Sequence, residues 1–265
     1  MANANSSRLR APGVFPGARW RRWGMLLLLG AAFYARAEAE VAEGRRGKAC
    51  EAARAAFRHS PTNVVAAWRL ARTCFDCSLE APEKSRRAIC AEEGMAAARA
   101  ALKLDPRSAA GFYYLALNEG QLASTKTLGA LSLVKDMERH LLRARELDQT
   151  FDYGGPDRTL GLLYRDAPGW PISVGSRKKA RRHLERALAI APGYFENHLN
   201  LIETFIQWRK RKEALRAYAA ARKLLPDALC RFTGERWAGS WADWNRRWTR
   251  AEATIQQWRE KEKSR

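Results

Sequence analysis

Apolar residues along most of this 265-residue chain are spaced by three and four, which places them on one face of a helix. A fixed order of small, bulky, small and proline residues occurs twice with an offset of 34 residues: Ala180, Leu184, Ala187, Pro192 and Ala214, Tyr218, Ala221, Pro226. Small residues let two helices lie close together. A proline ends a helix because it lacks the amide hydrogen that the helix needs. The pattern predicts a chain of repeated helical hairpins.

The same register extends toward the N-terminus and marks the second helix of each hairpin. The further copies are Ala49, Ala53, Ala56, Pro61; Gly94, Ala98, Ala101, Pro106; and, with lower fidelity, Met137, Leu141, Ala144, Gln149. The first helices follow in phase, and Leu160, Gly161 and Tyr164 reproduce the L-G-x-x-Y core of the tetratricopeptide pattern. The chain therefore resembles the tetratricopeptide repeat superfamily. This resemblance implies an all-α solenoid with about four overlong hairpins, an N-terminal half repeat and a C-terminal capping helix.

The first three hairpins are longer than the last one. Measured from the leucine of the first helix to the small residue of the second, they exceed it by 11, 9 and 7 residues, and the extra residues fall at the turn inside each hairpin. Two interpretations stay open. The helices are a turn or two longer, or the turns form a dedicated binding edge along one side of the solenoid.

One segment carries a narrower resemblance. Residues 147–192 read LDQTFDYGGPDRTLGLLYRDAPGWPISVGSRKKARRHLERALAIAP and resemble the periplasmic T-component proteins that accompany tripartite ATP-independent (TRAP) transporters. The likeness covers roughly residues 45–226. It implies a helical solenoid, in some cases a homo-oligomer, that partners a solute-binding receptor of the transporter and holds a small hydrophobic ligand.

The first 37 residues have the pattern of a cleaved signal peptide. Six arginines and no acidic residue precede Glu38, and the apolar run 25–34 ends in Ala35-Arg36-Ala37. That run has about half of the ~20 residues needed to span a bilayer, and no second run follows. We therefore expect export to the periplasm and no transmembrane span after cleavage. An uncleaved short anchor is the alternative.

The chain is strongly basic, but it lacks the features of a nucleic-acid-binding protein. Its formal net charge is +20, and the six arginines of residues 1–37 account for six of these charges, which leaves +14. The basic residues are scattered along the polar sides of the predicted helices, with no docking motif or interleaved aromatic face. We therefore expect no nucleic-acid partner, although a basic surface attracts anionic partners.

A binding groove is expected on the concave surface formed by the first helices. When each first helix is phased on its leucine, aromatic and charged residues turn toward that groove: Trp68, Arg72, Phe75, Tyr113, Arg158, Arg165 and Glu203. Such a lining suits an extended peptide or a small amphipathic acid. For each of these residues, ordinary packing between helices or solvation is the alternative.

The five cysteines lie in the predicted exported part of the chain, where disulfides can form. Cys77 and Cys90 flank the longest insertion and are the candidate disulfide; Cys50 with Cys74 is a second pairing. The Cys74-x-x-Cys77 spacing invites a redox interpretation, but no thioredoxin-like context surrounds it. The histidines show no ligand spacing with the cysteines, so no metal site is expected.

Catalytic motifs and cofactor fingerprints are missing, which predicts a protein that is not an enzyme and has no cofactor.

The C-terminal region carries a stripe of tryptophans. Trp237, Trp241, Trp244 and Trp248 lie at helical spacing on one face, followed by further apolar residues in the same phase. A solenoid needs its last apolar face covered, so this helix is either a cap or an interface for a partner or a second copy. The predicted organisation is a signal peptide (1–37), a repeat domain (38–226) and a Trp-rich capping helix with a basic tail (227–265).

These observations predict an exported interaction protein that docks an envelope protein, for which a TRAP solute receptor is the first candidate. The alternative is a periplasmic carrier of a small hydrophobic or amphipathic acid. A cysteine-based redox protein is the third hypothesis, and the missing acid–base partner argues against it.

Overall fold

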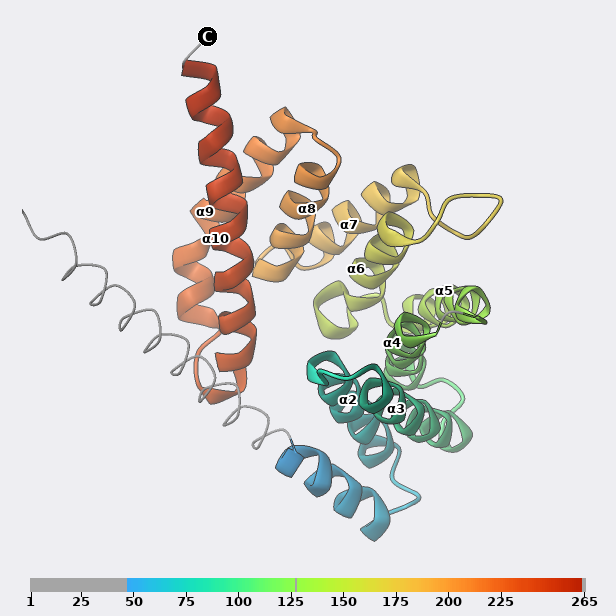
Figure 1. Cartoon of the computed structure of the whole chain (residues 1–265). Coiled ribbons are helices and arrows are strands. Elements are labelled where there is room, and N and C mark those ends of the chain that lie inside the picture. Colours follow the sequence, from blue (N-terminus) through green and yellow to red (C-terminus); the bar gives the residue numbers. More distant parts are fainter. Residues whose placement is uncertain (1–46, 127, 264–265) are drawn as a thin grey trace, which may run out of the picture. The chain divides into compact units, whose positions relative to one another are not determined.

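The computed structural model describes residues 47–126 and 128–263. The described residues from Lys48 onward form one compact unit, and the predicted signal peptide (1–37) lies outside the described residues. A helix that ends at residue 59 is followed by α2 (Val64–Glu80), α3 (Lys84–Leu104), α4 (Ala109–Thr125), α5 (Ala130–Leu147), α6 (Phe151–Asp166), α7 (Arg177–Ile190), α8 (Phe195–Gln207), α9 (Arg211–Arg231) and α10 (Glu235–Lys263) (Figure 1).

The helices pair as four successive hairpins, and the predicted fold class is confirmed. Helices α2 and α3, α4 and α5, α6 and α7, and α8 and α9 pack against each other in pairs. Each first helix also contacts the next first helix, from α2 through α8 to α10. The helix at residues 47–59 is the N-terminal half repeat, and α10 covers α8 and α9 at the other end. No strand occurs in the part of the chain that the structure describes, and none of its helices is long and apolar enough to cross a membrane.

The repeat register read from the sequence is the register of the core. The small and bulky residues of the second helices are buried in α3, α5, α7 and α9, apart from the half-buried Met137, and the leucines of the first helices are buried in α2, α4, α6 and α8. The copy predicted in the helix at residues 47–59 is wrong as a core register, because Ala49 and Ala56 are exposed there and Ala53 is half-buried. A Cβ atom added at Gly161 would lie 2.6 Å from Cγ of Leu184, so only glycine allows α6 to approach α7 this closely. The repeat pattern therefore reports helix-to-helix packing.

The extra residues of the first two hairpins lengthen their helices. Helices α2 and α3 contain 17 and 21 residues, whereas α8 contains 13, and only residues 81–83 link α2 to α3. The hairpin of α6 and α7 differs, because residues 167–176 form a true loop between its helices. The interpretation that the helices are a turn or two longer is thus correct for the first two hairpins. The third hairpin instead contains a loop that is a candidate for binding.

Local sequence explains most helix boundaries, with one exception at Pro226. The side chains of Asn63, Ser108 and Ser176 accept hydrogen bonds from the first backbone amides of α2, α4 and α7. Pro226 was predicted to end the last second helix and the repeat domain, but α9 continues through it to Arg231. Beyond the proline, Ala228 and Phe232 are almost fully buried. Their packing offsets the cost of proline inside the helix.

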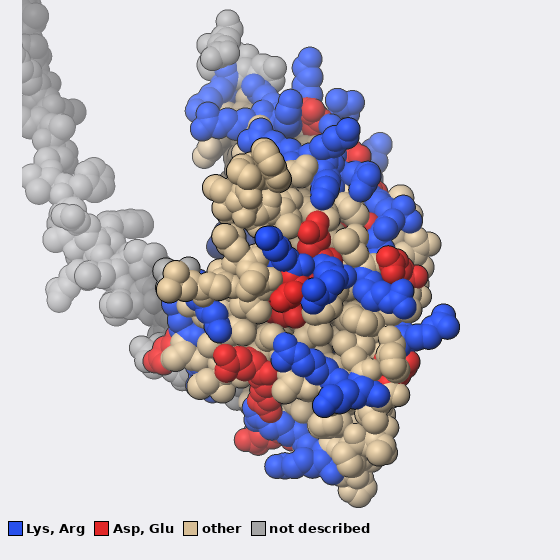
Figure 2. All heavy atoms as spheres, turned by 90° about the vertical axis from the view of Figure 1, so that its right-hand side faces the viewer, with Lys and Arg blue, Asp and Glu red and all other residues tan. Residues whose placement is uncertain are grey.

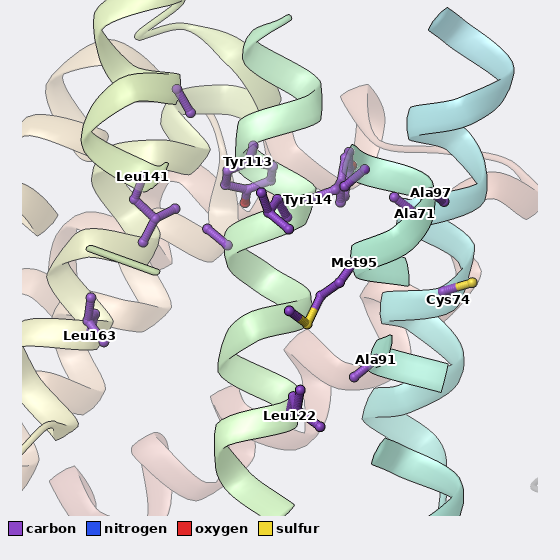
Figure 3. Close-up of a cluster of buried hydrophobic side chains, with 14 of the residues drawn as sticks. Ala71, Cys74, Ala91, Met95, Ala97, Tyr113, Tyr114, Leu122, Leu141 and Leu163 are labelled. Carbon is purple, nitrogen blue, oxygen red and sulfur yellow. The ribbon is translucent and has the colours of Figure 1, made fainter. Parts of the chain in front are cut away.

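The core is a row of apolar clusters along the repeats. The largest of them contains residues from the helix at residues 47–59 through α7. Two others lie in the region from α6 to α10. Figure 3 shows part of the first cluster, where Met95 of α3 reaches toward Tyr114 and Leu122 of α4. The cluster that α10 closes is rich in aromatic rings, including Tyr194, Phe195, Phe232 and Trp244.

Candidate functional site

The predicted groove residues separate into an accessible group and a closed group. Trp68, Arg72 and Phe75 form the accessible group on α2. Trp68 is half-buried and stacks on Tyr114, with ring centroids 5.9 Å apart, and the Arg72 side chain remains 57% exposed. This group is open to contact with another molecule.

Tyr113 and Arg158 belong to the closed group, which corrects their predicted placement on an open groove. Both are buried, together with Tyr194 and Asn197 of the next hairpin. The Arg158 guanidinium donates to the Asp152 carboxylate and backbone carbonyl and, at 3.4 Å each, to the Tyr113 hydroxyl and the Asn197 side-chain oxygen. We call Tyr113, Asp152, Arg158, Tyr194 and Asn197 the inner cluster. Its polar groups bind one another, so it joins α4, α6 and α8.

Charges inside the inner cluster keep its arginine ionised. Burial alone would lower the pKa of Arg158, but the neighbouring Tyr113, Asp152 and Glu196 groups raise it well above its ordinary value. Burial, with Asp152, also raises the pKa of Tyr113, so this phenol stays protonated and can act as a hydrogen-bond donor. Because the arginine is both charged and saturated with partners, this cluster is suited to rigid positioning of the first helices.

A left-handed segment at the start of α6 places Asp152 in the inner cluster. Asp152, Tyr153 and Gly154 have φ values of 50°, 58° and 77°, a conformation that non-glycine residues rarely adopt. It turns the Asp152 carboxylate to Tyr113, at 3.1 Å, and the Tyr153 carbonyl to the Asn197 amide, at 3.0 Å. Sequence reasoning missed Asp152 and Asn197 as partners of Arg158. The Gly154-Gly155-Pro156 sequence signalled only a bend.

Arg165 and Glu203 also connect neighbouring first helices. Arg165 of α6 forms an ion pair with Asp166, at 2.7 Å, and donates to the Thr204 hydroxyl of α8, at 3.3 Å. Both carboxylate oxygens of Glu203 lie 2.8 Å from the Arg247 guanidinium of α10. Arg247 was missing from the predicted site, and its place in the tryptophan-stripe helix is the signal that could have found it.

The tryptophan stripe lies against α8 and α9. Trp244 is 1% exposed, and Trp237, Trp241 and Trp248 are half-buried against the same cluster. Trp248 stacks on Tyr218 of α9, with ring centroids 4.6 Å apart, and Trp241 donates from its indole nitrogen to the Phe232 carbonyl. These contacts place the stripe in the position of a cap.

All five cysteines are free thiols in the structure, which therefore contains neither the candidate disulfide between Cys77 and Cys90 nor the alternative pairing of Cys50 with Cys74. Burial, with the nearby Cys50 and Cys90, raises the pKa of Cys77 to about 12, and burial also raises the pKa of Cys74 and of Cys90. Protonated thiols are poor nucleophiles at neutral pH, which argues against a cysteine-based redox enzyme. Contrary to the sequence analysis, Cys50, Cys74 and Glu93 present a group of metal-ligating atoms.

Exposed apolar side chains gather at the turns inside the first three hairpins. Leu79 lies in the last turn of α2, Leu128 and Leu131 flank the start of α5, and Trp170 and Ile172 lie in the loop between α6 and α7. Trp170 is 88% and Leu128 89% exposed. We call these five residues the turn edge. Two shallow surface hollows lie elsewhere, one over the helix at residues 47–59 and one on α5.

Surface charge does not single out a binding face. Figure 2 shows basic side chains spread over one face of the molecule, with acidic ones between them in several places. Several pairs are local, such as Arg181 with Glu185 and Arg143 with Glu146. This distribution is typical of a solvated surface, although the excess of basic groups still favours an acidic partner.

A buried histidine of α8 predicts a loss of stability in mild acid. Burial lowers the pKa of His198 from 6.5, although a hydrogen bond to the Pro192 carbonyl, at 2.8 Å, acts in the opposite direction. Below pH 6.5 the unfolded chain therefore takes up a proton that the folded chain binds less readily, so the free energy of unfolding falls as the pH falls. The slope is at most about 1.4 kcal/mol per pH unit. In melts across this range, His198→Gln should remove this part of the pH dependence and His59→Gln, at an exposed position, should retain it. Equal slopes for all three proteins would contradict the prediction.

Comparisons with known proteins agree with the fold. The family described as Regulator of microtubule dynamics protein 1-3 matches residues 33–152. A thermophilic TPR protein from Thermus thermophilus is 20% identical, with a TM-score of 0.60 over 86% of this chain and 97% of that one. The structure of MamA is 19% identical, with a TM-score of 0.48 over 71% of this chain and 93% of MamA. No curated protein sequence matches this chain significantly. The chain thus has the tetratricopeptide-type solenoid fold.

Proposed function

We propose that this chain is a non-enzymatic helical-repeat scaffold that binds a protein partner through its turn edge. The observation that carries the proposal is the exposure of Trp170 on a closed loop. Hairpins stacked in one order present their internal turns along one edge, so the exposed apolar residues of three hairpins lie on the same side of the solenoid. A tryptophan is the residue type most enriched among those that dominate binding energy.

The loop that carries Trp170 is pinned at its base. The Gly175 amide donates to the Pro168 carbonyl at 2.9 Å, the Ser176 amide donates to the Tyr164 carbonyl at 2.8 Å, and the Ile172 amide donates to the Gly169 carbonyl at 3.0 Å. A loop already held in one conformation loses little entropy when a partner binds. The indole is therefore presented in a form suited to an interface.

Two partners follow from separate resemblances. The resemblance of residues 147–192 to T-components favours a TRAP solute receptor, and with the signal-peptide pattern it supports the proposal of a periplasmic location. The family match at residues 33–152 favours microtubules, because its description names the regulation of their dynamics. A chain with a net charge of +20 is attracted to any acidic protein surface, so charge does not decide between them.

The accessible group of Trp68, Arg72 and Phe75 supports an alternative function, in which the protein carries a small amphipathic acid. Trp68 and Phe75 offer apolar area beside the exposed Arg72 guanidinium, which can pair with a carboxylate. Mass spectrometry of protein purified in native form tests this function. A retained acid that is lost in Arg72→Leu would support it, and protein free of any bound small molecule would exclude it for this preparation.

The turn-edge proposal is tested by photo-crosslinking from position 170. Trp170 is replaced by a photoreactive phenylalanine analogue in cells, and the matched control carries the analogue at Leu229 of α9, which is 52% exposed. An adduct with one protein from position 170 and none from position 229 supports the proposal and identifies the partner. An adduct with a second copy of this chain would assign the edge to a homo-oligomer, and no adduct from position 170 would contradict the proposal.

Binding measurements with the partner so identified give the size of the effect. Trp170→Ser should weaken its affinity about 30-fold or more, the scale of a residue that dominates an interface, with no change in melting temperature. Leu229→Ser should leave the affinity unchanged. For microtubules the measurement is co-sedimentation, and for a solute receptor it is titration calorimetry.

A further inference from the structure

Four cysteine thiols converge where the N-terminal helix meets the first hairpin. Cys50 comes from the helix at residues 47–59, Cys74 and Cys77 from α2, and Cys90 from α3. Cys50 is 3% exposed and Cys74 is fully buried. The Sγ atoms of Cys50 and Cys74 lie within 4.8 Å of each other, Cys77 follows Cys74 by about one helical turn on α2, and Cys90 lies on α3, which packs against α2. We call these four residues the thiol cluster.

A carboxylate completes the donor set. The Sγ atoms of Cys50 and Cys74 and a carboxylate oxygen of Glu93 lie within 4.8 Å of one another. Glu93 is held by Arg54, whose Nη2 and Nε atoms lie 2.6 and 2.5 Å from its two oxygens. In Figure 3 the Cys74 sulfur points away from Tyr113, Tyr114 and Leu122 of α4. A core that served only apolar packing would not need cysteines from three helices next to a carboxylate that is held in place.

We propose that Cys50, Cys74, Cys77 and Glu93 bind a zinc ion, with Arg54 as a positioning residue. Zinc forms bonds of about 2.3 Å to sulfur and about 2.0–2.2 Å to carboxylate oxygen. Two donors on one tetrahedral zinc ion are about 3.5–3.8 Å apart. Cys50, Cys74 and Glu93, whose donor atoms lie within 4.8 Å of one another, would therefore close by about 1 Å, and Cys77, which lies outside that group, would make a larger movement. The mixed sulfur and oxygen donors favour zinc over monovalent copper, which prefers sulfur, and over magnesium or calcium, which prefer oxygen.

The ion would join three helices at the start of the solenoid. The helix at residues 47–59 has no hairpin partner among the described residues, and its contact with α2 and α3 includes Cys50 and Arg54. A metal bound by Cys50 on this helix, Cys74 and Cys77 on α2 and Glu93 on α3 would fix the half repeat to the first hairpin. Structural zinc sites commonly stabilise small helical elements in this way.

The test uses cobalt as a spectroscopic substitute for zinc in the full-length, reduced protein. One cobalt ion per chain should produce a sulfur-to-cobalt charge-transfer band in the near ultraviolet and strong visible bands typical of tetrahedral coordination, and zinc should displace it. Cys50→Ser and Cys74→Ser should each weaken the charge-transfer band and the affinity for cobalt, and the double variant should lose the band, whereas Cys230→Ser, at an exposed position in α9, should leave both unchanged. Arg54→Met should keep the band but weaken metal affinity about 10- to 100-fold, the usual effect of losing a residue that orients a ligand.

Two measurements protect the test against variants that fail to fold. Native mass spectrometry of the unmodified chain should show one zinc ion per molecule, and zinc should raise its melting temperature and protect Lys48 and Arg58 from trypsin. Unmodified protein that binds no cobalt or zinc would overturn the proposal. So would cobalt bands that survive in the double variant of Cys50→Ser and Cys74→Ser, or a stable disulfide within the thiol cluster that persists in the native cell extract.

Discussion

Replacement of Trp244 by alanine should lower the free energy of unfolding by about 3–5 kcal/mol. This indole is 1% exposed and lies among the rings of Tyr194, Phe195 and Phe232, with centroids 5.5–5.9 Å away. Its removal leaves a cavity in the cluster that α10 closes, and the ring contacts are lost as well. Chemical denaturation followed by circular dichroism measures the change.

Trp170 is the matched control, since the same substitution at this 88% exposed position removes no buried area. Trp170→Ala should change the free energy of unfolding by less than about 0.5 kcal/mol. If Trp244→Ala costs no more than Trp170→Ala while self-association or partner binding is lost, α10 is an interface and the capping role is wrong. Because α9 continues past Pro226, the truncation that removes the cap alone starts at Glu235.

Replacement of Asp157 by alanine should cost about 3–5 kcal/mol, the effect of removing one partner from a buried ion pair. The Asp157 side chain is fully buried in α6. Its oxygens lie 2.7 Å from His183 Nδ1, 3.1 Å from Arg145 Nε and 3.4 Å from Arg186 Nε. The variant leaves the buried His183 without an acceptor and the arginines without a counter-charge.

Asp166 is the control for Asp157, because it pairs with Arg165 at a 52% exposed position. Asp166→Ala should cost less than about 1 kcal/mol. Asp157→Asn keeps an oxygen that can accept from His183, so its cost should fall between the two. Equal melting temperatures for Asp157→Ala and Asp166→Ala would show that the buried carboxylate contributes nothing to stability.

The sequence was sufficient to predict the repeat because its signal is local. Residues such as Ala180, Leu184 and Ala187 face the core whenever their segment is helical, so their spacing fixed the second helices and, by phase, the first ones. Pro226 was misleading for the opposite reason. A proline has a local cost, but the burial of Ala228 and Phe232 depends on distant residues of α8 and α10.

The candidate site was harder to predict because its contacts cross between repeats. The helical positions of the leucines were enough to place Arg158 and Glu203 on first helices. The partners of these residues, Asn197 and Arg247, are 39 and 44 residues away in sequence. A helical phase gives the direction of a side chain and says nothing of what fills the space in front of it. The sequence paired Cys50 with Cys74 and Cys77 with Cys90, but it did not indicate Glu93, which shares no local motif with these cysteines.

The left-handed segment in the first turn of α6 gives the solenoid a connection that skips a hairpin. The Tyr153 ring stacks on Tyr194 of the next repeat, with centroids 4.4 Å apart, and also contacts Phe232 and Trp237 beyond it. In an ideal repeat array each unit interacts only with its neighbours, so the ends can fray independently. Here α6 is bound directly to the start of α10. Loss of the C-terminal helix would therefore be transmitted past one whole repeat, and this half of the protein should unfold as one cooperative unit.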